Sequence, residues 1–208
     1  MLKSIISCLA LFLVSLIGIA QIKLNPSYTY LKDGKEVGYN KGLKLLQSGD
    51  YVADVSDTNR TVKITKPKSL EVGDPFPFES MTDLKGKVIT PNDLKGKIVV
   101  INYWFIGCRP CVMEIPELNE IVHSFADQEV VFLAFANEIE PKVAAFIEKK
   151  PFDYTIVPNQ MTATLNKGIT IFPTHIFVNE EGIIEQRFSG YSEGVGDKIS
   201  SRIQKMLN

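Results

Sequence analysis

The most informative segment of this chain, residues 98–111, reads Ile98-Val-Val-Ile-Asn-Tyr-Trp-Phe-Ile-Gly-Cys-Arg-Pro-Cys111. As far as Phe105 it is β-branched, aromatic or apolar apart from one Asn, which is typical of a strand buried on both faces near the centre of a sheet. After Cys111, apolar residues recur at helical spacing as far as Phe125. The segment therefore predicts a strand that leads into a pair of cysteines at the beginning of a helix.

The spacing of Cys108 and Cys111 suits thiol–disulfide exchange at a helix N-terminus. The free N–H groups and the positive end of the helix dipole would stabilise a thiolate at Cys108. Arg109 would add a positive charge nearby, and Pro110 fits the first helical turn, where its missing N–H costs nothing. Cys111, about one turn further along, would then be the more buried partner.

Two other interpretations of the cysteine pair are a structural disulfide and half of a zinc site. A bridge across two residues would remove little entropy from the unfolded chain. Zinc needs further ligands, and His123 and His175, the only histidines, lie far apart in the sequence. The context of strand, Cys-x-x-Cys and helix favours redox chemistry.

Residues 103–116, Tyr-Trp-Phe-Ile-Gly-Cys-Arg-Pro-Cys-Val-Met-Glu-Ile-Pro, resemble the active-site segment of the TlpA/ResA-like branch of the thioredoxin superfamily, which is related to the AhpC/TSA proteins. Trp104 stands where that fold has a tryptophan, and Pro116 where its active-site helix is kinked. Asn102 occupies the position of a buried Asp in thioredoxin. Gly107 departs from the aromatic residue that many members have before the first cysteine. The resemblance implies a thioredoxin-like α/β sandwich with a central mixed sheet.

This resemblance implies an enzyme, a protein disulfide reductase, in which Cys108 attacks a substrate disulfide and Cys111 resolves the mixed disulfide; no dissociable cofactor is implied. Glu114 matches a carboxylate that this branch carries three residues after the second cysteine. It shares a helix face with Cys111 and Leu118, within the apolar stripe. Partial burial favours the neutral form of a carboxyl group, so Glu114 could exchange a proton with Cys111 near neutral pH. The alternative is a surface Glu114 that only complements the helix dipole.

Residues 171–174, Ile-Phe-Pro-Thr, precede the strand expected beside the active site. Only about 5–6% of X–Pro bonds are cis, but this position resembles the cis-proline loop of the thioredoxin fold, so we expect a cis bond before Pro173. The backbone of Phe172 could then pair with a substrate strand. Strand alternation turns His175 away from the face of Thr174, and we interpret both His175 and His123 as structural. The expected substrate-binding residues are Trp104, Arg109, Pro110, Phe172, Pro173 and Thr174.

Residues 1–20 resemble a signal peptide, with Lys3 before an apolar run from residue 5 to residue 19 and small residues before Gln21. The alternative is an uncleaved membrane anchor, although the run is shorter than the roughly 20 residues that a spanning helix needs. In both cases the catalytic part is exported to the periplasm or cell envelope. Cleavage would remove Cys8 and leave only the active-site pair of cysteines.

Residues 21–71 are richer in Tyr, Lys, Gly and Asp and predict a small β-rich extension. Asp33-Gly34 is a turn signal. Short strands are expected at Leu43–Gln47, Tyr51–Val55 and Thr61–Thr65. An extension of this size is marginal on its own, and it could serve as a structural element or as a platform for a partner.

Residues 72–208 predict the thioredoxin-like domain. Phe76–Phe78 and Val88–Thr90 indicate a hairpin before the central strand. The pattern then predicts strands at residues 130–136, 154–157, 174–179 and 183–188, and helices at residues 141–149, 161–165 and 197–207. Strands that alternate with helices and end in a hairpin form an α/β sandwich.

The composition, 45% hydrophobic and 23% charged with a net charge of −1, describes an ordinary globular protein. It gives no electrostatic reason to expect nucleic acid or an acidic membrane surface as a partner. The expected partners are a disulfide-containing protein and a membrane thiol–electron donor, either in cytochrome c maturation or in general redox homeostasis of the envelope. Two other functions are considered. A peroxiredoxin-like thiol peroxidase would need Thr at the position of Phe105. A non-catalytic binding module is disfavoured by the intact cysteine pair.

Overall fold

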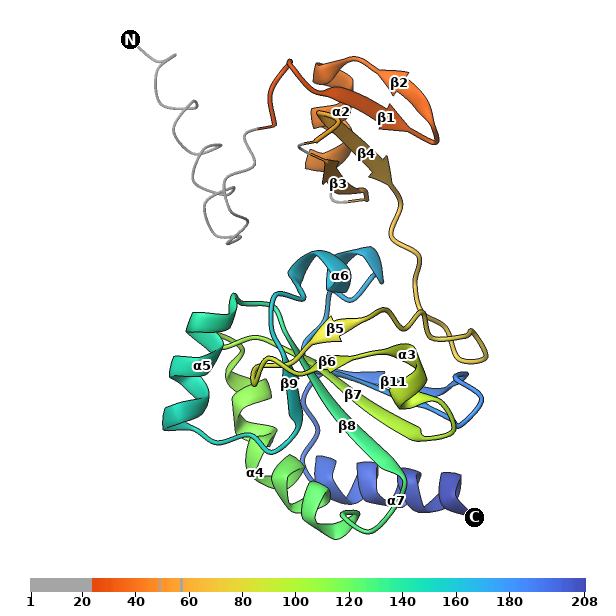
Figure 1. Cartoon of the computed structure of the whole chain (residues 1–208), viewed down its shortest axis with the longest axis vertical. Coiled ribbons are helices and arrows are strands. Elements are labelled where there is room, and N and C mark those ends of the chain that lie inside the picture. The colour runs from red at the N-terminus through yellow and green to blue at the C-terminus, as the bar shows by residue number, and fades with distance from the viewer. Residues whose placement is uncertain (1–23, 49, 57) are drawn as a thin grey trace. The chain divides into compact units, whose positions relative to one another are not determined.

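A computed structural model of the chain describes residues 24–48, 50–56 and 58–208 (Figure 1). Contacts within the chain divide it into two compact units, residues 1–66 and residues 67–208. The predicted signal segment, residues 1–20, lies outside the described residues. Within the described part, no helix is both long enough and apolar enough to cross a membrane.

The described residues of the N-terminal unit form a four-stranded sheet, in the order β2-β1-β4-β3, and one helix. Its core contains Tyr30, Val62 and Ile64, all almost fully buried. The turn at Asp33-Gly34 joins the first two strands, and both of its residues have positive φ angles (51° and 74°), as a tight hairpin turn requires. In chain order the elements are β1 (Thr29–Lys32), β2 (Lys35–Val37), α2 (Tyr39–Gln47), β3 (Val52–Ser56) and β4 (Thr61–Thr65).

The strand predicted at Leu43–Gln47 is wrong, because these residues form the second half of α2. Tyr39, Leu45 and Leu46 of this helix pack against the core of the sheet, a spacing that suits a helix and not a strand. Gly42 is buried where the helix approaches the sheet, and a Cβ atom there would lie 2.7 Å from Cδ1 of Tyr30. The two other predicted strands of this unit are confirmed as β3 and β4.

The second unit contains a five-stranded mixed sheet in the order β11-β10-β7-β8-β9. The central strand β7 is parallel to β8 and antiparallel to β10. A two-stranded hairpin precedes it. The strands of this unit are β5 (Met81–Thr82), β6 (Val88–Ile89), β7 (Ile98–Trp104), β8 (Val130–Ala136), β9 (Thr155–Val157), β10 (Thr174–Val178) and β11 (Ile184–Ser189).

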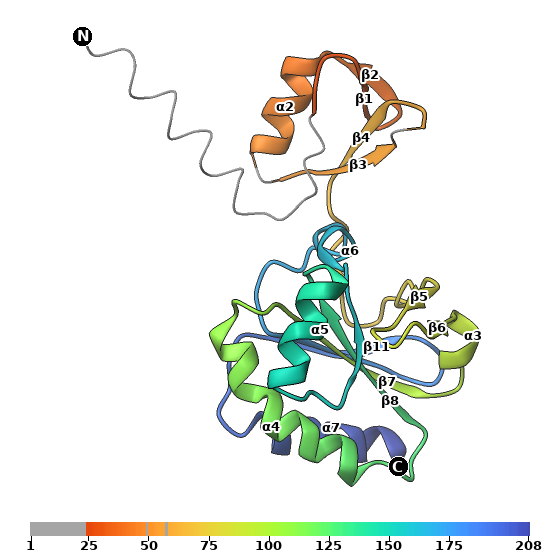
Figure 2. The same ribbon diagram turned by 60° about the vertical axis from the view of Figure 1, so that its left-hand side comes forward.

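Helices cover one face of this sheet, while the chain segments before β7 cover much of the other. Figure 2 shows α4, α5 and α7 together on their face, where their apolar side chains share one core with alternate residues of the strands. The opposite face packs against Leu70, Phe76, Ile89, Leu94 and Ile169. The helices of this unit are α3 (Pro91–Leu94), α4 (Arg109–Ser124), α5 (Glu140–Lys149), α6 (Met161–Asn166) and α7 (Val195–Leu207).

The α/β sandwich predicted from the alternation of strands and helices is confirmed, with two local differences. Phe76–Phe78 lie outside the hairpin strands. Phe76 is buried in the core beside the sheet, which explains the apolar pattern that predicted a strand there. The compact unit also begins before residue 72, since Leu70 is buried in the same core and the Lys68 N–H donates to the carbonyl of Asn166.

Candidate active site

The cysteine pair lies where the central strand passes into helix α4. All seven residues of β7 are buried, which fixes the position at which the chain leaves the sheet. Cys108 is the N-cap of α4, and its Sγ accepts a hydrogen bond from the Cys111 N–H at 3.3 Å. A thiolate at Cys108 would therefore sit at the positive end of the helix, next to a backbone donor.

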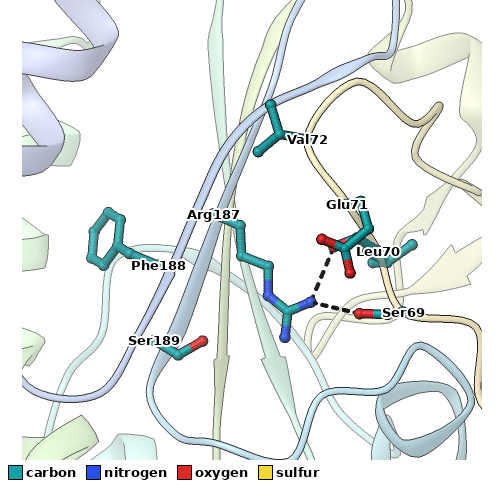
Figure 3. Close-up of a pocket in the computed structure, with 7 residues that line it drawn as sticks. All are labelled: Ser69, Leu70, Glu71, Val72, Arg187, Phe188 and Ser189. Atoms are coloured by element: carbon teal, nitrogen blue, oxygen red, sulfur yellow. Dashed lines mark hydrogen bonds between the residues drawn. The ribbon is translucent and has the colours of Figure 1, made fainter.

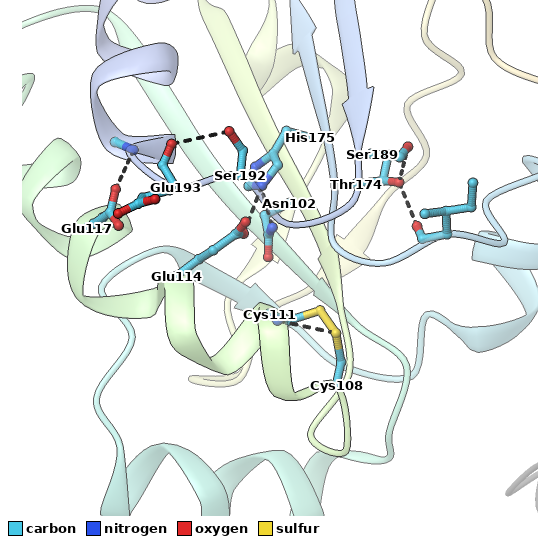
Figure 4. A network of polar contacts seen from close by, with 12 residues as sticks. Asn102, Cys108, Cys111, Glu114, Glu117, Thr174, His175, Ser189, Ser192 and Glu193 are labelled. Atoms are coloured by element: carbon cyan, nitrogen blue, oxygen red, sulfur yellow. Dashed lines mark hydrogen bonds and ion pairs between the residues drawn. A yellow bond between two sulfur atoms is a disulfide. The ribbon is translucent and has the colours of Figure 1, made fainter.

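Cys108 and Cys111 form a disulfide in this structure (Figure 4). Their exposed fractions are 5% and 3%, so burial does not separate the two residues in the disulfide form. Their positions in the helix do separate them, since Cys108 caps α4 while Cys111 lies within its first turn. Within the described residues, no group of three His, Cys, Asp or Glu side chains could hold a metal ion.

The loop before Cys108 is held by Glu138, a residue that follows strand β8. Oε1 of Glu138 accepts a hydrogen bond from the Ile106 N–H at 2.9 Å. The Cys108 N–H donates to the carbonyl of Phe105, and the Phe105 ring packs edge-on against Phe172. These contacts join the cysteine loop to the next strand and to the proline loop.

The peptide bond between Phe172 and Pro173 is cis, which confirms the prediction for this loop. Thr174 is fully buried, and it pairs with Tyr103 in the register of β10 and β7. Its hydroxyl donates to the carbonyl of Ile171 at 2.7 Å, so it accepts the hydrogen bond from the Ser189 hydroxyl at 2.6 Å. The side chain of Thr174 is thus hydrogen-bonded within the protein, and the residue lies between β7 and β11, away from the surface.

The other predicted substrate-binding residues differ in exposure. Arg109 is exposed and Pro110 is half-buried beside the cysteines. Trp104 is only 1% exposed, and its ring packs against Phe146 and Phe152 in the core. The structure therefore places Trp104 beneath the surface that a substrate would touch.

Glu114 is buried between helix α4 and the sheet, where its side chain contacts a histidine. Its exposed fraction is 1%, and its Oε2 lies 3.1 Å from Nε2 of His175, which is completely buried. The Nδ1 atom of the same ring lies 3.5 Å from the amide nitrogen of Asn102. Figure 4 shows the three side chains from α4, β10 and β7 meeting on the face of the sheet that also carries the cysteines. This excludes the alternative of a surface Glu114 that only complements the dipole.

A separate hollow on this unit carries none of these groups. It is lined by residues 69–72 and residues 187–189 (Figure 3). The guanidinium of Arg187 donates to the carbonyl of Leu70 at 3.0 Å and contacts the Ser69 hydroxyl at 3.4 Å. Arg187 thus links residues 69 and 70, near the beginning of this unit, to strand β11.

Residues 72–187 match the AhpC/TSA family. The chain belongs to the AhpC/TSA family. Among curated proteins, it is 29% identical over 144 residues to the thiol-disulfide oxidoreductase ResA of Bacillus thuringiensis, covering 68% of this chain and 82% of that protein. It is 31% identical over 142 residues to ResA of Geobacillus kaustophilus, covering 67% of this chain and 81% of that protein.

Among solved structures, the AhpC/TSA unit resembles the thioredoxin domain of a thiol-disulfide oxidoreductase from Bacteroides vulgatus, with a TM-score of 0.58 and 28% identity, covering 67% of this chain and all of that one. The resemblance to the TlpA/ResA-like branch and to the thioredoxin fold is thereby confirmed. The chain is a thiol-disulfide oxidoreductase of this branch.

The sequence analysis did not predict that Glu138 would lie beside the cysteine loop. Glu138 lies two residues after the end of β8, which runs parallel to β7, and the carboxyl ends of parallel strands meet at one edge of the sheet. That rule could have placed it beside the cysteine loop. The predicted face of His175, opposite that of Thr174, is confirmed: the residue pairs with Asn102 of β7, and its ring contacts Glu114 of α4. His123, by contrast, is exposed and pairs with Asp153 at 3.0 Å.

Proposed function

We propose that this protein is an exported protein disulfide reductase that uses the Cys108–Cys111 dithiol. The observation that carries the proposal is the position of Cys108 at the N-cap of α4, with the Cys111 N–H directed at its sulfur. Backbone donors and the helix dipole favour the thiolate, which is the form that attacks disulfides.

The reaction begins from the reduced dithiol. The Cys108 thiolate attacks one sulfur of the substrate disulfide, a mixed disulfide forms, and the other substrate sulfur leaves as a thiolate that takes a proton from solvent. Cys111 then loses its proton to Glu114 and attacks Sγ of Cys108. The protein disulfide forms, and the second substrate sulfur leaves and takes up the proton. Two electrons have passed from the protein to the substrate, together with one proton from Cys111 and one proton from solvent.

The substrate would bind across the cis-proline loop. Phe172 is partly exposed beside Phe105, close to the cysteine loop, and its backbone can pair with an extended peptide as an added strand. Arg109 and Pro110 would contact the peptide from the other side. Trp104 and Thr174 would act from within, by supporting the loop and strand on which these contacts depend.

Export and the supply of electrons are further parts of the proposed function. Residues 1–20 would direct export to the periplasm or cell envelope, by a cleaved signal or a retained anchor. A membrane thiol transporter would return electrons to the disulfide. Reduction of a cytochrome c precursor and reduction of general envelope proteins are the two candidate uses.

Redox equilibration tests the proposal. The Cys108–Cys111 pair should be equilibrated with glutathione or dithiothreitol buffers and its reduction potential measured. A potential of about −300 mV would indicate a reductant, whereas one of about −120 mV would indicate an oxidant. Cys111→Ser should accumulate mixed disulfides through Cys108 in envelope extracts, and these identify the partners. A Cys108→Ser variant that trapped partners equally well would reverse the order of the two cysteines.

Membership of the AhpC/TSA family justifies one direct test of the thiol peroxidase alternative. Hydrogen peroxide consumption by the reduced protein should not exceed that of a simple dithiol, because Phe105 stands where a peroxidatic cysteine would have a threonine hydroxyl nearby. Faster consumption would favour the peroxidase. A disulfide that never cycles with any thiol would favour the non-catalytic binding module.

A further inference from the structure

We propose that His175 is a positioning residue that holds Glu114 ready to take the proton from Cys111. The inference deepens the proposed function and rests on it. The sequence pattern predicts a structural role for His175. Its buried contact with Glu114, between β10 and α4, is the evidence for a role in the reaction.

The pairing of strands places His175 beneath the active-site helix. His175 lies directly opposite Asn102 in the antiparallel register of β10 and β7, so the two side chains share one face of the sheet. Helix α4 covers that face, and Glu114 is one turn beyond Cys111 on it. The amide of Asn102 on β7 and the carboxyl group of Glu114 on α4 thus each contact the imidazole of His175 on β10.

The contacts assign the ring proton of His175. The amide nitrogen of Asn102 is a donor only, so at 3.5 Å it calls for a lone pair on Nδ1. Nε2 then carries a proton, which it donates to Oε2 of Glu114 at 3.1 Å. Because both side chains are enclosed, no water competes at this bond.

This bond occupies Oε2 of Glu114 and fixes the orientation of the carboxyl group. Oε1 of Glu114 has no hydrogen-bond partner among the described residues. Protonation at Oε1 leaves the bond from Nε2 to Oε2 intact, so the proton from Cys111 can arrive and depart without rearrangement of the histidine.

The ring of His175 is fixed on its other side as well. It stacks on Phe188 of β11, with ring centroids 4.8 Å apart, and the Lys198 ammonium lies over the Phe188 ring, 4.1 Å from its centroid. A ring held in this way can direct its proton at one oxygen. The geometry is that of an orienting residue, since His175 touches Glu114 and neither cysteine is its hydrogen-bond partner.

Other titratable groups near the pair have defined roles. Burial raises the pKa of Tyr154, and the charge of Glu114 raises it further, so that hydroxyl stays neutral through the working range. Glu117 of α4 accepts a hydrogen bond from the Gly196 N–H of α7. Lys198 faces the Phe188 ring, and the two cysteines are the reacting groups. The pH dependence of resolution should therefore follow Cys111 and Glu114.

Single-turnover kinetics of the full chain test the proposal, with the attack by Cys108 and the resolution by Cys111 measured separately on a disulfide-bonded peptide. His175→Phe keeps an aromatic ring on Phe188 but removes the donor. It should slow resolution at least about tenfold, towards the roughly 10²–10⁴-fold expected of Glu114→Gln, and leave attack within about threefold. His175→Gln restores an N–H near the position of Nε2 and should recover most of the rate.

Two further readouts distinguish positioning from a merely structural role. In His175→Phe, the pH profile of resolution should differ from that of the wild type while the pH profile of attack by Cys108 does not, because the hydrogen bond to Oε2 of Glu114 is lost. The double variant His175→Phe/Glu114→Gln should resolve no more slowly than Glu114→Gln, since a residue that acts through another adds nothing once that residue is lost.

Equal losses in both steps, additive losses in the double variant, or a Gln variant as slow as the Phe variant would overturn the proposal. His175→Leu serves as the donor-free variant if the Phe side chain prevents folding, which thermal unfolding detects. Failure of the proposed function looks different: the wild-type dithiol would not reduce the peptide. Wild-type reduction with normal resolution in His175→Phe would reject the role of His175 alone.

Discussion

The Nε2 atom of His175 lies 3.1 Å from Oε2 of Glu114, and both side chains are completely enclosed (0% exposed each). The two residues are 61 positions apart in the chain, on β10 and on α4. Among the described residues, one oxygen of this buried carboxyl group is paired and the other has no hydrogen-bond partner, which is costly to keep in a fold. Its place one helical turn beyond Cys111 fits the proposed transfer of a proton between the two residues.

The first prediction concerns Glu114. Glu114→Gln is nearly isosteric but removes the proton acceptor, so resolution of the mixed disulfide should slow by roughly 10²–10⁴-fold. Attack by Cys108 should change little, because the helix end activates that sulfur. Stopped-flow measurement of the two steps checks this, with Glu120→Gln on the exposed side of the same helix as the matched control. Unchanged resolution, or an equal loss in both steps, would reject the proton-transfer role.

The second prediction concerns the two cysteines. In the reduced, folded protein, Cys108 should react with iodoacetamide below about pH 8.5, the usual pKa of a free thiol, because the Cys111 N–H and the helix end stabilise its thiolate. Cys111 should stay protected. Mass spectrometry of labelled peptides across pH measures both rates, and labelling in denaturant is the control. Equal labelling of both thiols at every pH would contradict their assigned roles.

Local signals explain why the centre of this fold was predictable. Strand β7 is buried on both faces and therefore reads as a continuous β-branched and aromatic run. The beginning of α4 is marked by Cys108 at the N-cap and Pro110 in the first turn. Such signals need only neighbouring residues, so the bounds of β7 and α4 agree with prediction to within one or two residues.

The pair of His175 and Glu114 depends instead on long-range register. Alternation within β10 gives the face of His175, but only the pairing of β10 with β7, and the position of α4 above them, shows which residue it meets. In the N-terminal unit, Gly42 reads as a helix breaker, yet it is the residue that lets α2 approach Tyr30. The spacing of the apolar residues in α2 is a local helix signal, but the close approach of Gly42 to Tyr30 is a tertiary contact that no local pattern reports.

The third prediction concerns Glu138. Glu138→Ala removes the acceptor of the Ile106 N–H and should lower the free energy of unfolding by about 1–2 kcal/mol, the lower part of the range for a charged acceptor, because the site is only half-buried. Glu138→Gln keeps an oxygen at the position of Oε1 and should cost less. Chemical denaturation of the three proteins provides the measurement. An Ala variant as stable as the Gln variant would show that this bond does not hold the cysteine loop.

The last prediction concerns Gly42 in the N-terminal unit. Alanine is normally better than glycine inside a helix by about 1 kcal/mol, but here its Cβ would lie 2.7 Å from Cδ1 of Tyr30 and 3.2 Å from Cδ1 of Ile64. Tyr30 is fully buried and packs edge-on against Tyr39, so its ring cannot move aside freely. Because overpacking costs about 1–3 kcal/mol, Gly42→Ala should destabilise this unit. Hydrogen exchange of residues 24–66 should become faster than in the exposed control Lys41→Ala, while the disulfide-reduction rate of the cysteine pair stays unchanged. Slower exchange in Gly42→Ala than in the control would show that helix propensity outweighs the contact with Tyr30.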